Sequence, residues 1–176
     1  MSARVIVLVG FMAAGKSTVG RLLAQRLGWR FIDFDDEIVR RTGTDVATLF
    51  REHGERRFRE LEQQLTAELT SVHRAVLAPG GGWIANAAAR ERIGPGEVLV
   101  WLRVSPEEAV RRAAGSGVER PLLAGSDPLA AARTLLAVRE PLYAAAHIVV
   151  DVDGIAPDRI VNEILDQLEV ESDGTE

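Results

Sequence analysis

A glycine-rich turn close to the amino terminus contains the only lysine of the chain. The turn reads Gly-Phe-Met-Ala-Ala-Gly-Lys-Ser-Thr over residues 10–18, which fits the pattern Gly-x-x-x-x-Gly-Lys-Ser/Thr. Every other residue among the 21 lysines and arginines is an arginine. Such a turn wraps backbone N–H groups around a phosphate, and its lysine reaches the β and γ oxygens as a compact point charge. Because a larger, planar guanidinium does not replace that charge, residues 10–18 predict a site for a nucleoside triphosphate.

The residues on either side of this turn predict a strand before it and a helix after it. Residues 5–9 read Val-Ile-Val-Leu-Val, which is typical of a strand buried on both faces of a parallel sheet. Apolar residues then recur at helical spacing over residues 16–27. A helix that begins at the turn directs amide donors and the positive end of its dipole toward an anion. Ala13 stands where many such turns have another glycine, so we expect its φ to stay negative.

The composition excludes several classes of protein. A length of 176 residues with 47% hydrophobic and 27% charged residues fits one globular domain. The formal net charge of −5 argues against a general nucleic-acid binder. The absence of cysteine excludes disulfides, thiolate metal sites and cysteine nucleophiles. No run reaches the roughly 20 apolar residues that a membrane span needs. A signal peptide would be cleaved within the turn, so we interpret the apolar start as a strand and expect a cytoplasmic protein.

Strand and helix patterns alternate along the chain, which predicts an α/β fold with a parallel sheet and right-handed crossovers. Further strands are expected at residues 31–33, 75–78, 98–102 and 148–150. Helices are expected at residues 45–53, 55–71, 86–93, 128–145 and 158–168, and from residue 105 onward. A glycine-rich segment with little periodicity covers about residues 114–127, and an acidic tail covers 169–176. Because we find no repeat and no linker, we expect a single domain.

Two aspartates follow the second predicted strand. Asp33 and Asp35 should therefore lie at the carboxyl edge of the sheet, where α/β folds bind ligands. Alternation along an extended stretch would turn one carboxylate toward the shell of a metal ion and the other toward an acceptor hydroxyl. Acids after a strand also commonly cap the next helix, and we expect Asp36 and Glu37 to do so. We favour a functional role for Asp33 and Asp35.

Three glycines end the third predicted strand at the same edge of the sheet. Residues 80–82 expose bare amides and let a ligand approach the main chain closely, whereas a tight turn alone needs fewer glycines. Arg59, Arg120 and Arg139 would each be interpreted as solvated charges if they were considered singly. Their order and spacing relative to the other motifs favour a functional role instead.

As a set, these motifs resemble those of the shikimate kinase family over about residues 4–166. The similar segments are the turn at 10–18, Phe-Ile-Asp-Phe-Asp-Asp-Glu-Ile at 31–38, Phe-Arg-Glu-Leu-Glu at 58–62, the glycines at 80–82, Arg-Pro-Leu-Leu at 120–123 and Arg-Glu-Pro-Leu-Tyr at 139–143. The resemblance implies a three-layer P-loop kinase fold whose five-stranded parallel sheet has the order 2-3-1-4-5. It also implies a substrate-binding segment at about residues 33–62 and a mobile lid at about residues 114–127.

The activity that this resemblance implies is ATP-dependent phosphorylation of the 3-hydroxyl of shikimate, in the biosynthesis of chorismate and aromatic amino acids. The implied cofactor is Mg²⁺, with ATP as co-substrate. We expect a monomer whose partners are these small molecules, and neither nucleic acid nor a membrane.

The resemblance further implies roles for individual residues. Those implied to bind ATP are Gly10, Ala13, Ala14, Gly15, Lys16, Ser17, Thr18, Arg112, Arg120 and Pro157. Those implied to bind shikimate are Asp35, Arg59, Gly80, Gly81, Gly82 and Arg139. Ser17 would hold the metal directly and Asp33 through water. Lys16, Asp35 and Arg120 would form the catalytic set, in which Asp35 is the candidate base.

Within this group of motifs, Arg59 and Arg139 would bind the carboxylate of shikimate, because a guanidinium pairs with a planar carboxylate through two hydrogen bonds. Arg120 would move with the lid onto the phosphate, and Arg112 would stack on adenine. Pro79 and Trp83 depart from the family pattern on either side of the three glycines, so the sequence does not predict the shape of this side of the pocket.

Two other functions are compatible with a phosphate-binding turn. A kinase for another small hydroxy acid, such as gluconate, would use the same turn, although Arg-Pro-Leu-Leu and the triple glycine favour shikimate. A regulatory switch that hydrolyses nucleotide would belong to a different class. A guanine-specific switch normally carries Asn-Lys-x-Asp, and the single lysine at position 16 excludes that motif.

Overall fold

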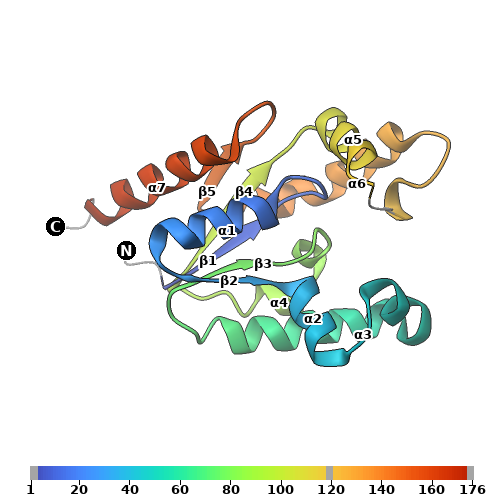
Figure 1. Ribbon diagram of the computed structural model, residues 1–176, viewed down its shortest axis with the longest axis horizontal. Helices are drawn as coiled ribbons and strands as arrows, with labels where there is room; N and C mark the ends of the chain where they lie inside the picture. The colour runs from blue at the N-terminus through green and yellow to red at the C-terminus, as the bar shows by residue number, and fades with distance from the viewer. Residues whose placement is uncertain (1–3, 118–120, 174–176) are drawn as a thin grey trace.

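The computed structural model describes residues 4–117 and 121–173, so the expectation for Arg120 lies outside the described residues. The chain forms a five-stranded sheet between layers of helices (Figure 1). All strand pairs are parallel, and the strand order is β2-β3-β1-β4-β5. The predicted fold class and strand order are therefore confirmed.

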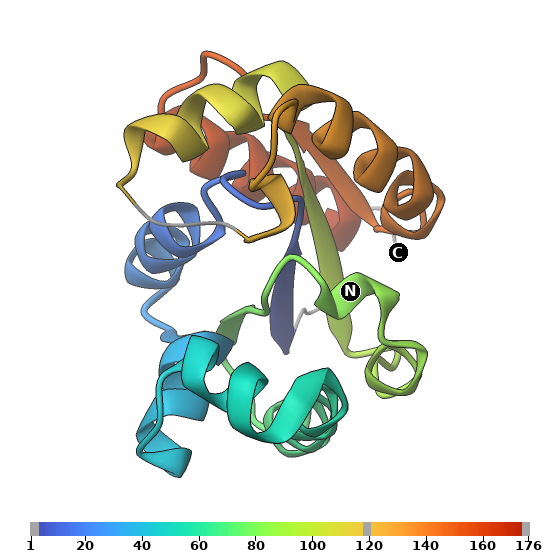
Figure 2. The ribbon, with the colours of Figure 1, turned by 90° about the vertical axis from the view of Figure 1, so that its right-hand side faces the viewer.

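The strands are β1 (Val5–Val9), β2 (Arg30–Asp33), β3 (Ala75–Ala78), β4 (Glu97–Arg103) and β5 (Ile148–Asp151). The helices are α1 (Lys16–Leu27), α2 (Phe34–Thr42), α3 (Val46–Leu69), α4 (Ala87–Arg90), α5 (Pro106–Gly115), α6 (Pro128–Tyr143) and α7 (Pro157–Asp173). Two short 3-10 helices are η1 (Trp83–Ala85) and η2 (Pro121–Leu123). Helices α1 and α7 contact each other over one face of the sheet, and α4 and α6 lie on the other side (Figure 2).

Strand β1 is the central strand of the sheet, between β3 and β4. Its apolar residues are all buried, because β3 and β4 pair with its two edges and helices cover both faces of the sheet (Figure 1). Val7 is in register with Leu77 of β3, and Leu77 is in register with Ile32 of β2. The carboxyl ends of these three parallel strands therefore meet at one edge. This edge carries the phosphate turn, the aspartates and the three glycines.

Helix α3 contains a break that the sequence pattern predicted. Gly54 has a φ of 77° and a ψ of 169°, so it separates the helix into two parts, as expected from the separate patterns at 45–53 and 55–71. In the second part, Phe58, Leu65 and Leu69 are buried. Glu62 occupies the same buried face, which is unusual for a carboxylate. Within residues 4–117 and 121–173, no helix is long and apolar enough to cross a membrane.

Gly20 permits the close packing of α1 against β2. A β-carbon at Gly20 would overlap the ring of Phe31. In an exposed helix, Gly→Ala would gain about 1 kcal/mol of helix propensity. Here we expect Gly20→Ala to lower the free energy of unfolding by about 1–2 kcal/mol, since overpacking a core costs roughly 1–3 kcal/mol. Urea denaturation measures this difference. Gly115→Ala is the control, because its β-carbon would meet no atom within 4 Å. A Gly20→Ala variant more stable than wild type would contradict the packing argument.

Candidate active site

The phosphate turn brings the lysine ammonium against its own backbone. Lys16 Nζ donates to the carbonyl oxygens of Gly10 at 2.8 Å and Phe11 at 3.1 Å. Gly15 precedes α1 with a φ of 92°, and no side chain in the described part of the chain caps this helix terminus. The amino terminus of α1 therefore has no side-chain cap from the described residues that would compete with an anion, as the predicted role of residues 10–18 requires.

The expectation of a negative φ at Ala13 is wrong. Its φ is 61°, in the left-handed region. The amide of Ala14 donates to the carbonyl of Phe11 at 3.1 Å and closes a four-residue turn in which Ala13 is the third residue. Type II turns require a positive φ at that position, which explains why glycine is the common residue there. An alanine in this conformation costs about 1–2 kcal/mol, so the other contacts of the turn must hold it in place.

Asp33 ends β2 and also caps the helix that follows. One carboxylate oxygen, Oδ1, accepts from the amides of Asp35 at 3.0 Å and Asp36 at 3.4 Å, which makes Asp33 the N-cap of α2. The expectation that Asp36 and Glu37 form the cap is therefore wrong. The other oxygen, Oδ2, accepts from Ser17 Oγ at 2.5 Å. One side chain thus fixes the start of α2 and faces the phosphate turn.

Asp35 lies in the first turn of α2, so the expected alternation along an extended strand is also wrong. The helix begins directly after Asp33, and helical geometry turns the two carboxylates in different directions. Asp35 Oδ1 is buried and has no hydrogen-bond partner among the described residues. Burial raises the pKa of Asp35, and the charge of Asp33 raises it further, whereas the charge of Lys16 lowers it. A carboxylate in this position is a candidate proton acceptor.

A cavity of about 460 Å³ joins most of the predicted site residues. The residues that line it are Met12, Ala13, Gly15, Lys16, Ser17, Thr18, Asp33, Asp35, Ala78, Pro79, Gly80, Gly81, Arg112 and Ser116. Of the predicted residues that do not line the cavity, Gly10 and Ala14 lie buried in the turn behind it. Gly82 follows the two lining glycines directly, Arg59 lies against Gly82, and Arg139 donates to the carbonyl oxygen of Gly81.

The glycine wall, residues 80–82, contacts both predicted carboxylate-binding arginines. A β-carbon on Gly82 would overlap the guanidinium of Arg59, so only glycine lets this arginine lie there. The carbonyl oxygen of Gly81 accepts from Arg139 Nη1 at 3.0 Å and from the Tyr143 hydroxyl at 3.2 Å. Arg139 is almost fully buried, with 7% exposure. The two arginines therefore flank the same short segment of backbone.

Arg59 has two carboxylate partners that sequence reasoning did not assign. Its Nη1 donates to Glu62 Oε2 at 2.6 Å, and its Nη2 lies 3.2 Å from Glu55 Oε1. Glu62 has no exposed surface, whereas the side chain of Glu55 is 66% exposed. The sequence contained one sign of a buried partner: Glu62 is a charged residue on the apolar face of the helical pattern at 55–71.

Tyr143 is a second residue whose role the sequence motifs did not indicate. Its ring stacks on Trp101 with ring centroids 5.4 Å apart. Burial raises the pKa of Tyr143 to about 12, so its hydroxyl stays a hydrogen-bond donor to Gly81 at neutral pH. Trp83, whose effect on the wall was left open, is buried, and its indole N–H donates to Thr66 Oγ1 at 3.0 Å. Tyr143 therefore contacts the glycine wall at Gly81, and Trp83 contacts it through its backbone amide, which donates to the carbonyl oxygen of Gly80 at 3.0 Å.

Arg112 reaches the phosphate turn from α5. Its Nη1 lies 3.3 Å from the carbonyl oxygen of Ala13, and its Nη2 donates to the carbonyl of Val152 at 2.8 Å. Because Val152 follows β5, this contact ties the connection between β5 and α7 to the turn. Pro157 is the first residue of α7, beyond that connection, and is not among the residues that line the 460 Å³ cavity.

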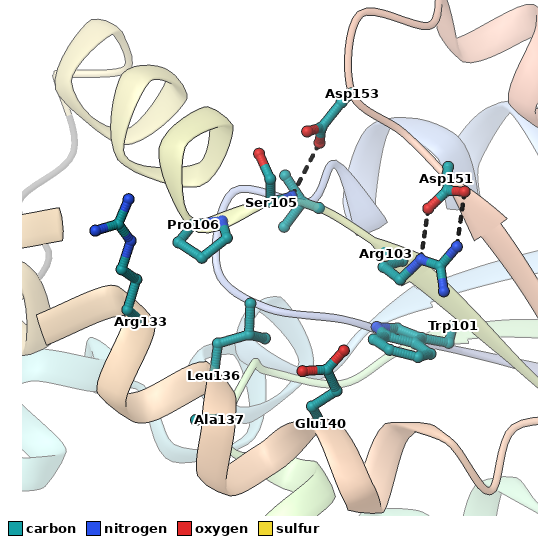
Figure 3. Close-up of a pocket in the computed structure, with 11 residues that line it drawn as sticks. Trp101, Arg103, Ser105, Pro106, Arg133, Leu136, Ala137, Glu140, Asp151 and Asp153 are labelled. Carbon is teal, nitrogen blue, oxygen red and sulfur yellow. Dashed lines mark hydrogen bonds and ion pairs between the residues drawn. The ribbon is translucent and has the colours of Figure 1, made fainter. Parts of the chain in front are cut away.

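A second groove, of about 420 Å³, lies between α6 and the ends of β4 and β5 (Figure 3). Trp101 and Leu136 form apolar walls, and none of the predicted site residues lines it. Arg103 pairs with Asp151 at 2.5 Å and 2.8 Å, and Asp153 accepts from the amide of Ser105 at 3.0 Å. These contacts connect the last residues of β4 and β5 and the segments that follow them.

Comparisons with known proteins agree with this geometry. The family model of shikimate kinase matches residues 12–169. A shikimate kinase of Moorella thermoacetica is 44% identical over 163 residues, which are 93% of this chain and 93% of that protein. The solved structure of shikimate kinase from Acinetobacter baumannii in complex with shikimate is similar with a TM-score of 0.89 and 39% identity, covering 99% of this chain and 97% of that one. A gluconokinase from Sinorhizobium meliloti reaches a TM-score of 0.65 at 21% identity, covering 98% of this chain and 95% of that one, which shows a shared fold alone.

Proposed function

The chain belongs to the shikimate kinase family, and from this premise we propose that it transfers the γ-phosphoryl group of ATP to the 3-hydroxyl of shikimate. The observation that carries the proposal is the 460 Å³ cavity, which joins the phosphate turn to the carboxylate of Asp35 and the glycine wall. Phosphoryl transfer depends mainly on positioning and on neutralising charge. The cavity has groups for both tasks.

In this proposal the phosphate turn binds the triphosphate. The ammonium of Lys16 would leave the carbonyls of Gly10 and Phe11 and contact the β and γ oxygens. The amides at the start of α1, which have no side-chain cap among the described residues, would donate to the same anion. Arg112 lies at the turn and at Val152, which supports a place for it beside the nucleotide base.

The side chains of Ser17 and Asp33 fit a magnesium ion. A hydroxyl and a carboxylate oxygen lie 2.5 Å apart beside the phosphate turn, and both are hard oxygen donors of the kind that Mg²⁺ prefers. No cluster of three or more potential metal-ligating acids, histidines or cysteines occurs among the described residues. Mg²⁺ in kinases commonly uses one or two side chains together with phosphates and water. A bound Mg²⁺ would neutralise charge on the β and γ phosphates.

Asp35 would accept the proton of the attacking hydroxyl. Its buried oxygen without a donor faces the cavity wall near Gly80, and its raised pKa makes it a better base than an exposed aspartate. The substrate carboxylate would bind to Arg59 and Arg139 on either side of the glycine wall. These two arginines would hold the ring so that one hydroxyl reaches Asp35.

We propose that about residues 114–127 close over the nucleotide and bring Arg120 to the phosphate. The positive φ values of Gly117 (66°) and Gly125 (156°) support two bending points at the borders of this segment. We further propose a cytoplasmic monomer with one domain.

A coupled assay of ADP release tests the proposed reaction. The purified protein is given ATP and Mg²⁺ with shikimate, with gluconate or with no acceptor. We expect rapid release with shikimate and little with the other two. Faster release with gluconate would favour the alternative hydroxy-acid kinase, and equal release without an acceptor would indicate a nucleotide hydrolase.

Arg139→Ala should separate the two substrates. Loss of a buried charged hydrogen-bonding group costs about 1.5–3 kcal/mol, so we expect KM for shikimate to rise roughly 10- to 100-fold while KM for ATP changes little. Steady-state kinetics with each substrate varied in turn measure both values. Arg111→Ala is the control, because that side chain is 72% exposed on α5. Equal effects of Arg139→Ala on both KM values would show that Arg139 does not bind the carboxylate of shikimate.

A further inference from the structure

Glu62, which pairs with Arg59 of the proposed substrate site, is fully buried, and only one of its two carboxylate oxygens accepts a hydrogen bond from the described residues. Its Oε2 accepts from Arg59 at 2.6 Å, but its Oε1 has no hydrogen-bond partner among the described residues. A β-carbon on Gly80 would lie 3.6 Å from this Oε1 and 3.5 Å from Asp35 Oδ1. Two carboxylate oxygens without donors therefore border the same small space beside the glycine wall.

The groups that face Glu62 come from three elements. Arg59 lies one turn earlier on α3, Asp35 lies on α2, and Asn86 is the N-cap of α4. Burial raises the pKa of Glu62 to about 7 and the charge of Asp35 adds to this, while the charge and hydrogen bond of Arg59 lower it. The side-chain amide of Asn86 lies close enough to lower it as well, although its Nδ2 donates to the carbonyl oxygen of Arg59 at 3.1 Å and lies outside hydrogen-bond geometry with Glu62. The ion pair with Arg59 is thus the main interaction that keeps Glu62 ionised near neutral pH.

Binding of the substrate carboxylate changes this balance. The guanidinium of Arg59 already lies between Glu55 and Glu62, so a third carboxylate must share its charge. Glu55 is 66% exposed and can turn into water. Glu62 is enclosed by protein and cannot move away, so its negative charge would remain beside that of the substrate. A buried like charge is removed most readily by a proton.

We propose that Glu62 takes up a proton from solvent when the carboxylate of shikimate binds to Arg59. The inference rests on the proposed function and assigns Glu62 as a positioning residue that couples substrate charge to protonation. The proton enters on Oε1, the oxygen without a donor, and converts it into an O–H group next to Gly80, the glycine that Asp35 Oδ1 also borders. Arg59 is then free to direct its charge at the substrate.

The sign of the pH dependence follows from this coupling. The complex favours protonated Glu62, so the pKa of Glu62 is higher in the complex than in the free protein. Above about pH 7 the free protein lacks this proton, and binding must take it from solvent. We expect Kd for shikimate to rise with pH, by up to about tenfold per pH unit, until the pH exceeds the pKa of the complex.

Isothermal titration with shikimate alone, without ATP, tests the inference. Titrations at pH 7.5 in PIPES, HEPES and Tris, which differ in ionisation enthalpy, give the number of protons taken up from the slope of the observed enthalpy. We expect a fractional uptake of up to one proton for the wild type and none for Glu62→Gln, whose Kd should be nearly independent of pH. Glu55→Gln is the matched control on the same guanidinium and should retain the uptake.

The methyl ester of shikimate provides a test that needs no variant. It lacks the negative charge, so the wild type should bind it with weaker affinity and without proton uptake. Binding of shikimate without uptake, or unchanged uptake by folded Glu62→Gln, would overturn the role of Glu62 and leave the proposed reaction intact. If Glu62→Gln raised Kd by the same factor at every pH, the pH dependence of the wild type would persist without Glu62. Glu62 would then be a purely structural residue. Failure of shikimate to bind at all would overturn the proposed substrate, and this inference with it.

Discussion

Replacing Lys16 by arginine should lower kcat by at least two to three orders of magnitude, although the formal charge is kept. Removal of one preorganised donor to developing charge typically costs about 10²–10³ in kcat. The ammonium lies within 2.8 Å and 3.1 Å of two backbone carbonyls, so the turn encloses a compact cation. A guanidinium is larger and would have to displace the turn or remain outside it.

The measurement is kcat at saturating ATP, Mg²⁺ and shikimate. Lys16→Met serves as the comparison, since it removes the charge and keeps an unbranched side chain. We expect both variants to be similarly inactive and to unfold at urea concentrations close to that of the wild type. Turnover of Lys16→Arg at the wild-type rate would show that charge alone, rather than a compact ammonium, is needed at the phosphates.

The parallel α/β fold and the edge that carries the site could be predicted from sequence because each depends on local patterns, whereas the strand order was implied only by the resemblance to a family. The continuous apolar run at 5–9 predicts a strand buried on both faces, and β1 is indeed central. Ala13 and Asp33 show where local patterns fail. The sign of φ at Ala13 depends on which turn closes between Phe11 and Ala14. The cap of α2 depends on how soon the helix begins after β2, and this happens at Phe34.

The roles of Glu62 and Tyr143 could not be predicted in the same way. A glutamate three residues after an arginine on a helix normally forms an exposed pair that contributes little to stability. Only the packing of α3 beside Gly80 reveals that this pair is half enclosed. Tyr143 ends α6 and meets Gly81, which is 62 residues earlier in the chain. Contacts of this range depend on the complete fold, and a single sequence gives no direct sign of them.

Asp35→Asn should lower kcat by about 10²–10⁴, the range that a positioned general base contributes, with a smaller change in KM for shikimate. An amide has nearly the shape of the carboxylate and can still contact a hydroxyl, but it cannot accept the proton. Asp36→Asn is the matched control. The side chain of Asp36 is 75% exposed, and its Oδ2 lies 3.6 Å from Arg21 Nη2. Its replacement should therefore leave kcat unchanged.

Two further measurements distinguish a base from a binding group at Asp35. Burial and the charge of Asp33 raise the pKa of Asp35 above its usual 3.8, so wild-type kcat should fall on the acidic side at a higher pH than an exposed aspartate would give. Asp35→Asn should lose this fall. Because ionised Asp35 is buried with one oxygen unpaired, the variant should also be more stable than wild type at pH 8. A variant that changes only KM would make Asp35 a binding residue. The combination of lower kcat and higher stability would show that the site keeps an unfavourable buried charge for the sake of the proton transfer.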